Sequence, residues 1–323
     1  MNIISNFERV LSTYLESDVL ENAQYFGAIG TVMPDTVNGD VIVSLPKAGY
    51  LDAVKAGCKP TWVAGAAPTE KNWKLALAGI YVEWCADIFN KEITRMGNIY
   101  NLSADRAIAK FIKDYMTTAV ANSALAVAFL GDTTSTLTGA IKETDGIVKQ
   151  SMNGVNHVDL AAKNVAGGLS TKGDAIGYMR KLVESASGAL RQASDGVIIV
   201  TQALWDALAD DTMVNFGINI DGQWTSLYNG LKETKWGGYN VVVIPGLDEA
   251  ITATGDKGVL AGKPFYGLFT TKSNLEFGVA GNAQAGIADV NVGEDSRTQT
   301  TLASAKFAIG AAIVDDNMAV VLY

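Results

Sequence analysis

The sequence predicts an α+β fold, and three patterns in its 323 residues support this class. Residues 104–130 have the spacing of one long helix, from a capping Ser103 to a closing Gly131. Residues 174–244 alternate helical patterns with buried-strand patterns, which is typical of a small α/β lobe. Strand patterns dominate from Phe265 onward, and a chain that ends in strands usually completes a sheet begun elsewhere.

Composition excludes several classes of protein. Hydrophobic residues make up 48% of the chain and charged residues 18%, which excludes disorder driven by charge. A net charge of -9 argues against a surface built to neutralise nucleic acid or lipid headgroups. The most apolar stretch, 119–130, is too short to cross a bilayer, and the N-terminus lacks a signal-peptide pattern. We therefore expect a globular cytosolic chain with no membrane partner.

The N-terminal fifth is expected to be extended after a short amphipathic helix over 7–20. Four of the six prolines lie in the first 68 residues, where each disfavours helix. Asn38-Gly39, which lies between Val37 and the strand-like residues 41–43, predicts a hairpin. This region is predicted to be a long arm or loop that contributes little to its own core.

The compact part of the fold is expected to begin with residues 73–84, which are strand-compatible and apolar on both faces. A short helical segment then ends near Gly97, and residues 131–172 are expected to form loops with short strands. The remaining elements expected, in chain order, are a helix over 174–193, a strand over 197–200, a helix capped by Thr201, a strand over 241–244, strands over 265–269 and 275–279, and a closing hairpin of 307–314 with 318–322.

The sequence has few candidate residues for catalysis or metal binding. The single histidine, His157, is predicted to be a hydrogen-bonded loop residue, and every histidine-dependent catalytic scheme would have to use it. Cys58 and Cys85 are predicted to be buried thiols, with neither a disulfide nor a zinc site. Two acidic pairs are expected in solvated turns: Asp210–Asp211 and Asp315–Asp316. No catalytic, cofactor or metal site is predicted, and a structural or assembly role gains weight.

The order of these parts resembles the major capsid proteins of tailed phages, which have the HK97-like fold. The match covers most of residues 69–323 in order. The segments that carry it are the N-terminal arm with its Asn38-Gly39 loop, the long helix ending in Phe129-Leu130-Gly131-Asp132, the helix over 174–193, the strand over 197–200 with Thr201 to Trp205, Gly237 to Pro245, Leu275 to Val279, and the closing residues 307–323.

The resemblance implies four parts. These are an N-terminal arm over 1–35, an extended loop over 36–80, a peripheral domain of 81–139 and 258–323 with a long spine helix and a β-sheet, and an α/β axial domain over 140–257. Arm and loop would bury apolar surface against neighbouring copies. The intersubunit-contact candidates are Phe7, Asn38, Gly39, Lys47, Tyr50 and Trp62.

The implied function is self-assembly into the icosahedral head shell, as pentamers and hexamers, around the double-stranded DNA of a tailed bacteriophage. Scaffolding, portal and decoration proteins are the implied partners, and the DNA would be held without sequence-specific binding. Such a protein is not an enzyme, has no cofactor, and belongs to the virion after assembly in the host cytoplasm. Two alternatives stay open: an encapsulin-like bacterial nanocompartment shell, and a small-molecule enzyme on the α/β lobe that uses His157 or the paired acids.

Overall fold

The computed structural model describes residues 26–44, 69–85, 91, 94–95, 98, 115, 123–134, 139–154, 156–216, 225–226, 232–244, 247, 262–280, 289–295 and 300–323. The helices expected over 7–20 and before Gly97 lie wholly or mostly outside these residues, as does the first part of the 104–130 helix. Residues 123–130 are helical and end where the sequence predicts. Among the described residues, no helix has the length and apolarity needed to span a membrane.

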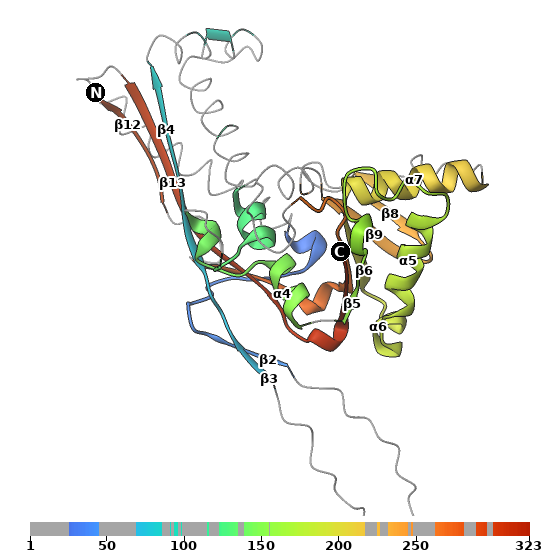
Figure 1. The fold of residues 1–323 in the computed structure, drawn as a ribbon. Coiled ribbons are helices and arrows are strands. Elements are labelled where there is room, and N and C mark those ends of the chain that lie inside the picture. Colours follow the sequence, from blue (N-terminus) through green and yellow to red (C-terminus); the bar gives the residue numbers. More distant parts are fainter. Residues whose placement is uncertain are drawn as a thin grey trace, which may run out of the picture.

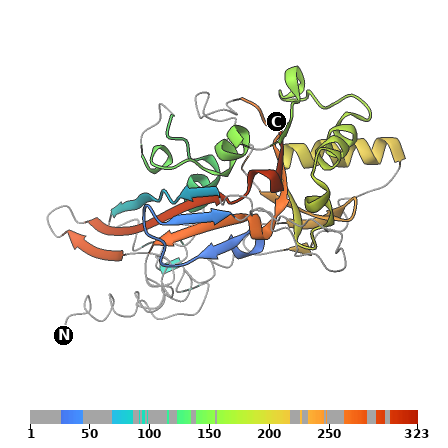
Figure 2. The ribbon, with the colours of Figure 1, turned by 90° about the horizontal axis from the view of Figure 1, so that it is seen from below.

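A five-stranded sheet is organised around one long strand, β13. Its members are β1 (Thr31–Met33), β4 (Ala76–Cys85), β11 (Leu275–Ala280), β12 (Asp289–Asp295) and β13 (Thr300–Ile313). One edge of β13 pairs with β4, and its other edge pairs first with β12 and then with β11. β1 adds to β11 in parallel. Figure 2 shows β4 and β13 side by side along this sheet.

A seven-stranded sheet forms the second layer. In spatial order its strands are β5 (Asn156–Val158), β14 (Ala319–Leu322), β10 (Gly267–Thr271), β6 (Gly196–Thr201), β9 (Tyr239–Ile244), β8 (Lys232–Trp236) and β7 (Thr225–Ser226). β6 and β9 run parallel, as do β14 and β5. β6, β10 and β14 are buried along their whole length, and most of their residues are apolar.

The helices lie on both faces of the seven-stranded sheet: the last three along the chain cover one face, and α4 packs with the five-stranded sheet against the other. They are α4 (Ile147–Gly154), α5 (Asp174–Glu184), α6 (Gly188–Gln192) and α7 (Gln202–Phe216), with the short 3-10 turns η1 (Ala140–Lys142), η2 (Ala161–Lys163), η6 (Lys272–Asn274) and η7 (Asp316–Met318). Ile198 and Val200 pack with α5 to α7, whereas Val197 and Ile199 pack with residues of the five-stranded sheet. Figure 1 shows α5, α6 and α7 together on one side of the molecule.

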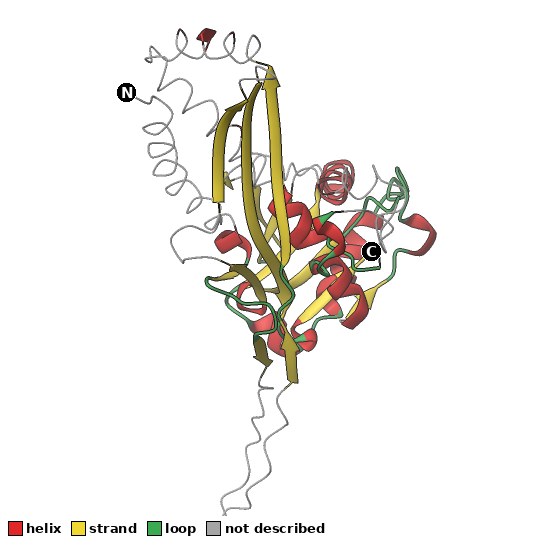
Figure 3. Ribbon diagram, turned by 90° about the vertical axis from the view of Figure 1, so that its left-hand side faces the viewer, coloured by secondary structure: helices red, strands yellow, loops and turns green. Residues whose placement is uncertain are grey.

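Two long extensions leave this body at opposite ends. Strand β12, together with the parts of β4 and β13 level with it, extends away from helices α4, α5, α6 and α7, as Figures 1 and 3 show. At the opposite end, β2 (Val41–Ser44) and β3 (Thr69–Asn72) form a two-stranded antiparallel ribbon. Ile42 and Trp73 anchor this ribbon against Ala312 on the face of the five-stranded sheet that lies away from the main core.

Both expected hairpins are wrong, although each turn exists. Asn38 and Gly39 form a turn with a Gly39 φ of 96°, but β2 pairs with β3 and not with the residues before the turn. Residues 315–317 also turn the chain, but β13 lies in the five-stranded sheet and β14 in the seven-stranded sheet. Asn274 holds this second turn, since its side chain accepts from Asp315 N (2.7 Å) and donates to Asp315 O (3.0 Å). Turn-forming residues reverse the direction of the chain, but tertiary packing selects which strand pairs with the strand after the turn.

Three further expectations need correction. The helix over 174–193 is two helices, because Ser187 caps a new start by accepting from Leu190 N (3.2 Å). Residues 131–172 contain the helix α4 as well as loops and a strand. Thr201 does not cap α7 with its hydroxyl, which accepts from Tyr266 N (3.2 Å) and donates to Pro264 O (2.9 Å).

The described part of the N-terminal region contributes more to the chain's own core than expected. Phe26 and Ile29 are buried in the main core, and the Phe26 ring lies 4.7 Å from that of Phe277. Trp73 is also buried and packs across Gly278. The prediction of a region with little core of its own is therefore wrong for residues 26–33, whereas the burial of Trp73, Ala76 and Ala78 agrees with the expected start of the compact part.

Candidate functional site

The residues proposed as alternatives for catalysis lie in different elements of the fold. His157 lies on the edge strand β5 and not in the expected loop, and it is exposed with its ring 6.0 Å from that of Tyr323. Asp315 accepts from Asn317 N (2.9 Å), and Asp316 pairs with Lys71 (2.7 Å). Among the described residues, no three His, Cys, Asp or Glu side chains gather as metal ligands.

Asp211 differs from the solvated turn acid that the sequence predicts. It lies inside α7 and is buried, whereas Asp210 is exposed. The Asp211 carboxylate accepts from Gly173 N (2.6 Å) and Ile176 N (3.2 Å) at the start of α5. A carboxylate in this position satisfies N–H groups that the first turn of a helix leaves without partners. Asp211 therefore joins α7 to α5.

A buried cluster of charges follows the helix at 123–130, and sequence analysis missed it. Lys149 on α4 contacts the carboxylate of Asp132 and lies 2.9 Å from that of Asp145. Asp132 also accepts from the N–H (2.8 Å) and hydroxyl (2.7 Å) of Thr134. Asp145 accepts in the same way from Thr133, at 2.8 Å in both cases. The cluster fastens α4 to the segment that follows the helix.

Hydrogen bonding decides the ionisation of this cluster. Burial alone raises the pKa of Asp132, but the hydrogen bonds from Lys149 and Thr134 outweigh it and hold that pKa below its usual value. The pKa of Asp145 is lowered in the same way, against its own burial. Burial lowers the pKa of Lys149, and the two carboxylates more than offset this and raise it. All three groups are therefore charged at neutral pH, which suits a structural joint.

Two glycines let the backbone cross beside this cluster. Gly146 N donates to Gly131 O at 2.8 Å. A Cβ added to Gly131 would lie 2.6 Å from Thr144 O, and one added to Gly146 would lie 2.6 Å from Phe129 O. Only glycine fits at either position without moving backbone.

The intersubunit-contact candidates divide into two groups. Phe7, Lys47, Tyr50 and Trp62 lie outside the described residues. Asn38 and Gly39 are exposed in their turn, where Asn38 Oδ1 accepts from Leu75 N (3.0 Å) and Gly39 N donates to Trp73 O (2.9 Å). These two residues hold the base of the β2–β3 ribbon, and their contact with another copy stays a prediction.

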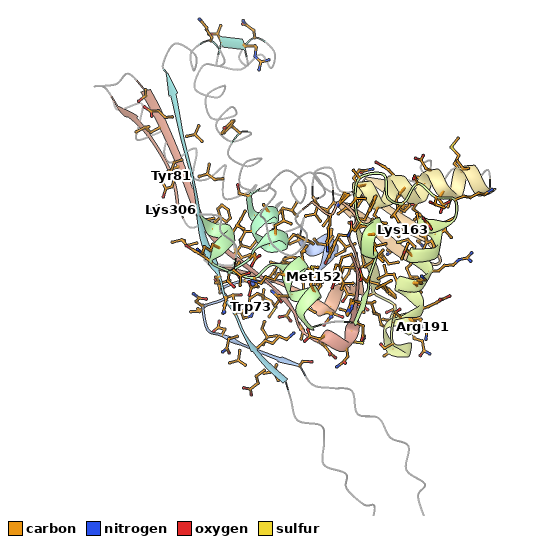
Figure 4. All side chains as sticks on the ribbon, in the orientation of Figure 1. Trp73, Tyr81, Met152, Lys163, Arg191 and Lys306 are labelled. Atoms are coloured by element: carbon orange, nitrogen blue, oxygen red, sulfur yellow. The ribbon has the colours of Figure 1, made fainter. Side chains whose placement is uncertain are left out.

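Large apolar side chains are exposed on one face of the β4, β12 and β13 extension. Leu77 and Tyr81 of β4 are 63% and 70% exposed, and Leu302 of β13 is 42% exposed. Alternate residues such as Ala76 and Ala78 are buried on the opposite face. The sequence carried a signal for this surface, because residues 73–84 are apolar on both faces although the described residues cover only one. Figure 4 labels Tyr81 and the exposed Lys306 on this extension.

No family model and no curated protein sequence matches the chain. Solved structures do match it, almost from end to end. A chain from Mycobacterium phage Ogopogo has a TM-score of 0.57 at 12% identity, with 92% of this chain and 90% of that chain covered. A chain of the satellite phage P4 procapsid, a structure that includes the size determination protein, has a TM-score of 0.55 at 10% identity, with 94% and 96% covered. A chain of the capsid of an empty GTA particle has a TM-score of 0.53 at 16% identity, with 92% and 88% covered.

The chain has the tailed-phage capsid fold. At these identities the likeness concerns the capsid fold and not individual residues. The mixed α+β class predicted from the sequence is confirmed. Among the described residues, the β4, β12 and β13 extension and the β2–β3 ribbon both leave the body and both carry exposed apolar side chains.

Proposed function

We propose that this protein is the major capsid protein of a tailed bacteriophage, which self-assembles into the icosahedral head shell around double-stranded DNA. The observation that supports this function is the match to capsid structures over 92% or more of the chain, with 88% or more of the P4 and GTA chains covered. A match of this extent leaves only a small part of either chain outside the shared fold. It favours a whole shell subunit over a shared domain joined to other machinery.

The exposed extensions supply a physical reason for assembly. Val41 and Val43 on the β2–β3 ribbon are 54% and 51% exposed, and Leu77 and Tyr81 are more exposed still. Apolar surface of this kind gains free energy when a neighbour covers it. Because symmetry repeats each contact many times, modest contacts add up to a stable shell.

Partners and location follow from the proposed function. We expect pentamers and hexamers of the chain itself, with scaffolding, portal and decoration proteins as additional partners, in the virion after assembly in the host cytoplasm. A net charge of -9 suits a container that holds DNA without gripping its phosphates. We also propose that the chain is not an enzyme and that its arm, extended loop, peripheral domain and axial domain follow the boundaries predicted from the sequence.

Electron microscopy of the purified full-length chain, alone and co-expressed with its neighbouring structural proteins, tests the function. Closed shells or capsomers are expected. A chain that stays monomeric under every condition would contradict the proposal. Shells that co-purify with an enzyme as cargo would favour the nanocompartment alternative. The enzyme alternative is tested by thermal shift with small molecules and by the His157→Ala variant. A response of the unaltered chain that disappears in His157→Ala would support catalysis. No response, together with shells that still assemble from His157→Ala, would argue against it.

A further inference from the structure

The base of the β2–β3 ribbon lies beside the turn that joins the two sheets. β13 ends in the five-stranded sheet at Ile313, and β14 begins in the seven-stranded sheet directly after η7. The side chain of Gln150 on α4 holds the end of β13, because it accepts from Ile313 N (3.1 Å) and donates to Ala311 O (2.7 Å). The end of β13 is therefore bonded to α4 at the point where the chain changes sheets.

Lys71 of β3 connects the ribbon to the same point. Its Nζ donates to Ile313 O at 2.7 Å and lies 2.7 Å from the carboxylate of Asp316 in η7. Ile313 thus contacts α4 through its N–H and the ribbon through its C=O. Among the described residues, no other side chain of β2 or β3 hydrogen-bonds to the rest of the subunit.

The other anchor of the ribbon is apolar and does not define a direction. Ile42 lies opposite Lys71 in the ribbon, so the two side chains share one face, and Ile42 packs with Trp73 and Ala312. Hydrophobic contact is non-directional and tolerates rotation, whereas a hydrogen bond requires a defined distance and angle. The two acceptors of Lys71 therefore fix an orientation of the ribbon that its apolar anchor leaves free.

The exposure of the Lys71–Asp316 pair suits a role in orientation more than a role in stability. The two side chains are 30% and 38% exposed, and ion pairs with such exposure contribute little to the free energy of unfolding. A two-stranded ribbon also has little stability of its own, so its direction depends on what holds its base.

We propose that Lys71 is a positioning residue, which presets the direction of the β2–β3 ribbon in the free subunit by connecting it to the joint between the two sheets. The inference rests on the proposed function, because assembly is what gives this direction a use. A preset ribbon loses less conformational freedom when subunits associate. A ribbon that points in the required direction about a tenth of the time would weaken the apparent affinity between subunits about tenfold.

Distances between two spin labels in the unassembled subunit test the orientation directly. The labels are attached at Val43→Cys on the ribbon and Arg191→Cys on α6, two exposed positions of which Figure 4 labels the second, in a chain whose Cys58 and Cys85 are replaced with serine. The distance distribution should be at least about twice as wide after Lys71→Met, because the ribbon then samples more directions. Equal widths with and without Lys71→Met would overturn the inference.

Three further variants separate orientation from charge. Lys71→Arg keeps a cation with several donors and should restore the narrow distribution. Asp316→Asn leaves the bond to Ile313 O in place, so it should widen the distribution less than Lys71→Met does. Lys74→Met is the matched control, since it removes the same charge from an exposed side chain that makes no hydrogen bond among the described residues. A control as wide as Lys71→Met would contradict a specific role of Lys71.

The lowest protein concentration at which the purified full-length chain forms shells, measured by electron microscopy, tests the consequence for assembly. Lys71→Met should raise this concentration about tenfold, and Lys71→Arg should not, with similar melting temperatures for all subunits. A wider label distribution without a higher threshold would overturn the role in assembly. A melting temperature that falls equally in Lys71→Met and Lys71→Arg would show a purely structural role. If the unaltered chain forms no shell, the proposed function fails, whereas the label distances still test the orientation.

Discussion

Replacing Lys149 with methionine tests whether its buried charge cluster holds the fold together. Lys149→Met keeps an apolar side chain of similar length but removes the cation shared by Asp132 and Asp145. Removing one partner of a buried pair destabilises by roughly 3–5 kcal/mol, because the remaining charge stays buried without compensation. The Asp145 side chain is 31% exposed and can regain water, so we expect a loss at the lower end, about 3 kcal/mol.

The loss should depend on pH with a definite sign. Both carboxylates have lowered pKa values, so the stability they contribute is fully present above their unfolded pKa values and is lost as the pH falls through their folded values. The difference between the natural chain and Lys149→Met should therefore be constant near neutral pH and shrink below about pH 4. Because the pKa of Lys149 is raised above 10.5, its contribution remains complete up to that pH and declines only as the pH rises through the raised value.

Urea unfolding of unassembled subunits, followed by tryptophan fluorescence over a range of pH, measures this difference. Lys163→Met is the matched control, because the Lys163–Asp174 pair is also close (2.5 Å) but Lys163 is exposed. We expect little change in stability from the control. A loss below about 1 kcal/mol for Lys149→Met, or a larger loss that stays the same at every pH, would refute the electrostatic argument and leave packing as the cause.

Three other substitutions test backbone and capping contacts. Gly146→Ala should abolish soluble expression or lower the urea midpoint strongly, because the added Cβ would lie 2.6 Å from Phe129 O. Gly177→Ala in helix α5 is the control: its added Cβ would have nothing within 4 Å, so the midpoint should rise slightly. Similar midpoints for both would contradict the steric argument. Asp211→Ala should destabilise the chain by about 1–2 kcal/mol in the same assay, because Gly173 N and Ile176 N at the start of α5 lose their acceptor. An unchanged midpoint would show that water replaces the carboxylate.

Local patterns predicted the buried strands and the ends of some helices. Val197 to Val200 and Val241 to Ile244 form strands because long β-branched runs suit a position covered on both faces. The helix over 123–130 ends at Leu130, as the sequence predicts, although Gly131 has no positive φ and its N–H still donates to Val127 O (3.0 Å). Periodicity did not reveal the break between α5 and α6, since apolar spacing continues across it and only the Ser187 cap marks the second start.

Sequence analysis did not reveal the charge cluster or the exposed face of β4, for a different reason. Asp132, Asp145 and Lys149 meet only because two glycines let the backbone cross closely. The direction of each backbone group on β4 depends on its pairing with β13, more than 200 residues later in the chain. The apolar character of both faces of this strand is visible in the sequence, but the face left uncovered is not.

The sequence by itself determined the α+β class, the buried central strands, the order of parts that resembles capsid proteins, and the acidic charge of the chain, because these depend on residue type and short-range spacing. Tertiary structure alone decided the strand partners of both turns, the assignment of β13 and β14 to different sheets, the burial of Phe26 and Ile29, and the exposure of Leu77 and Tyr81 on β4. The reason is physical: a turn or an alternating pattern constrains a few neighbouring residues, whereas pairing and burial are selected by the free energy of packing between segments far apart in the chain.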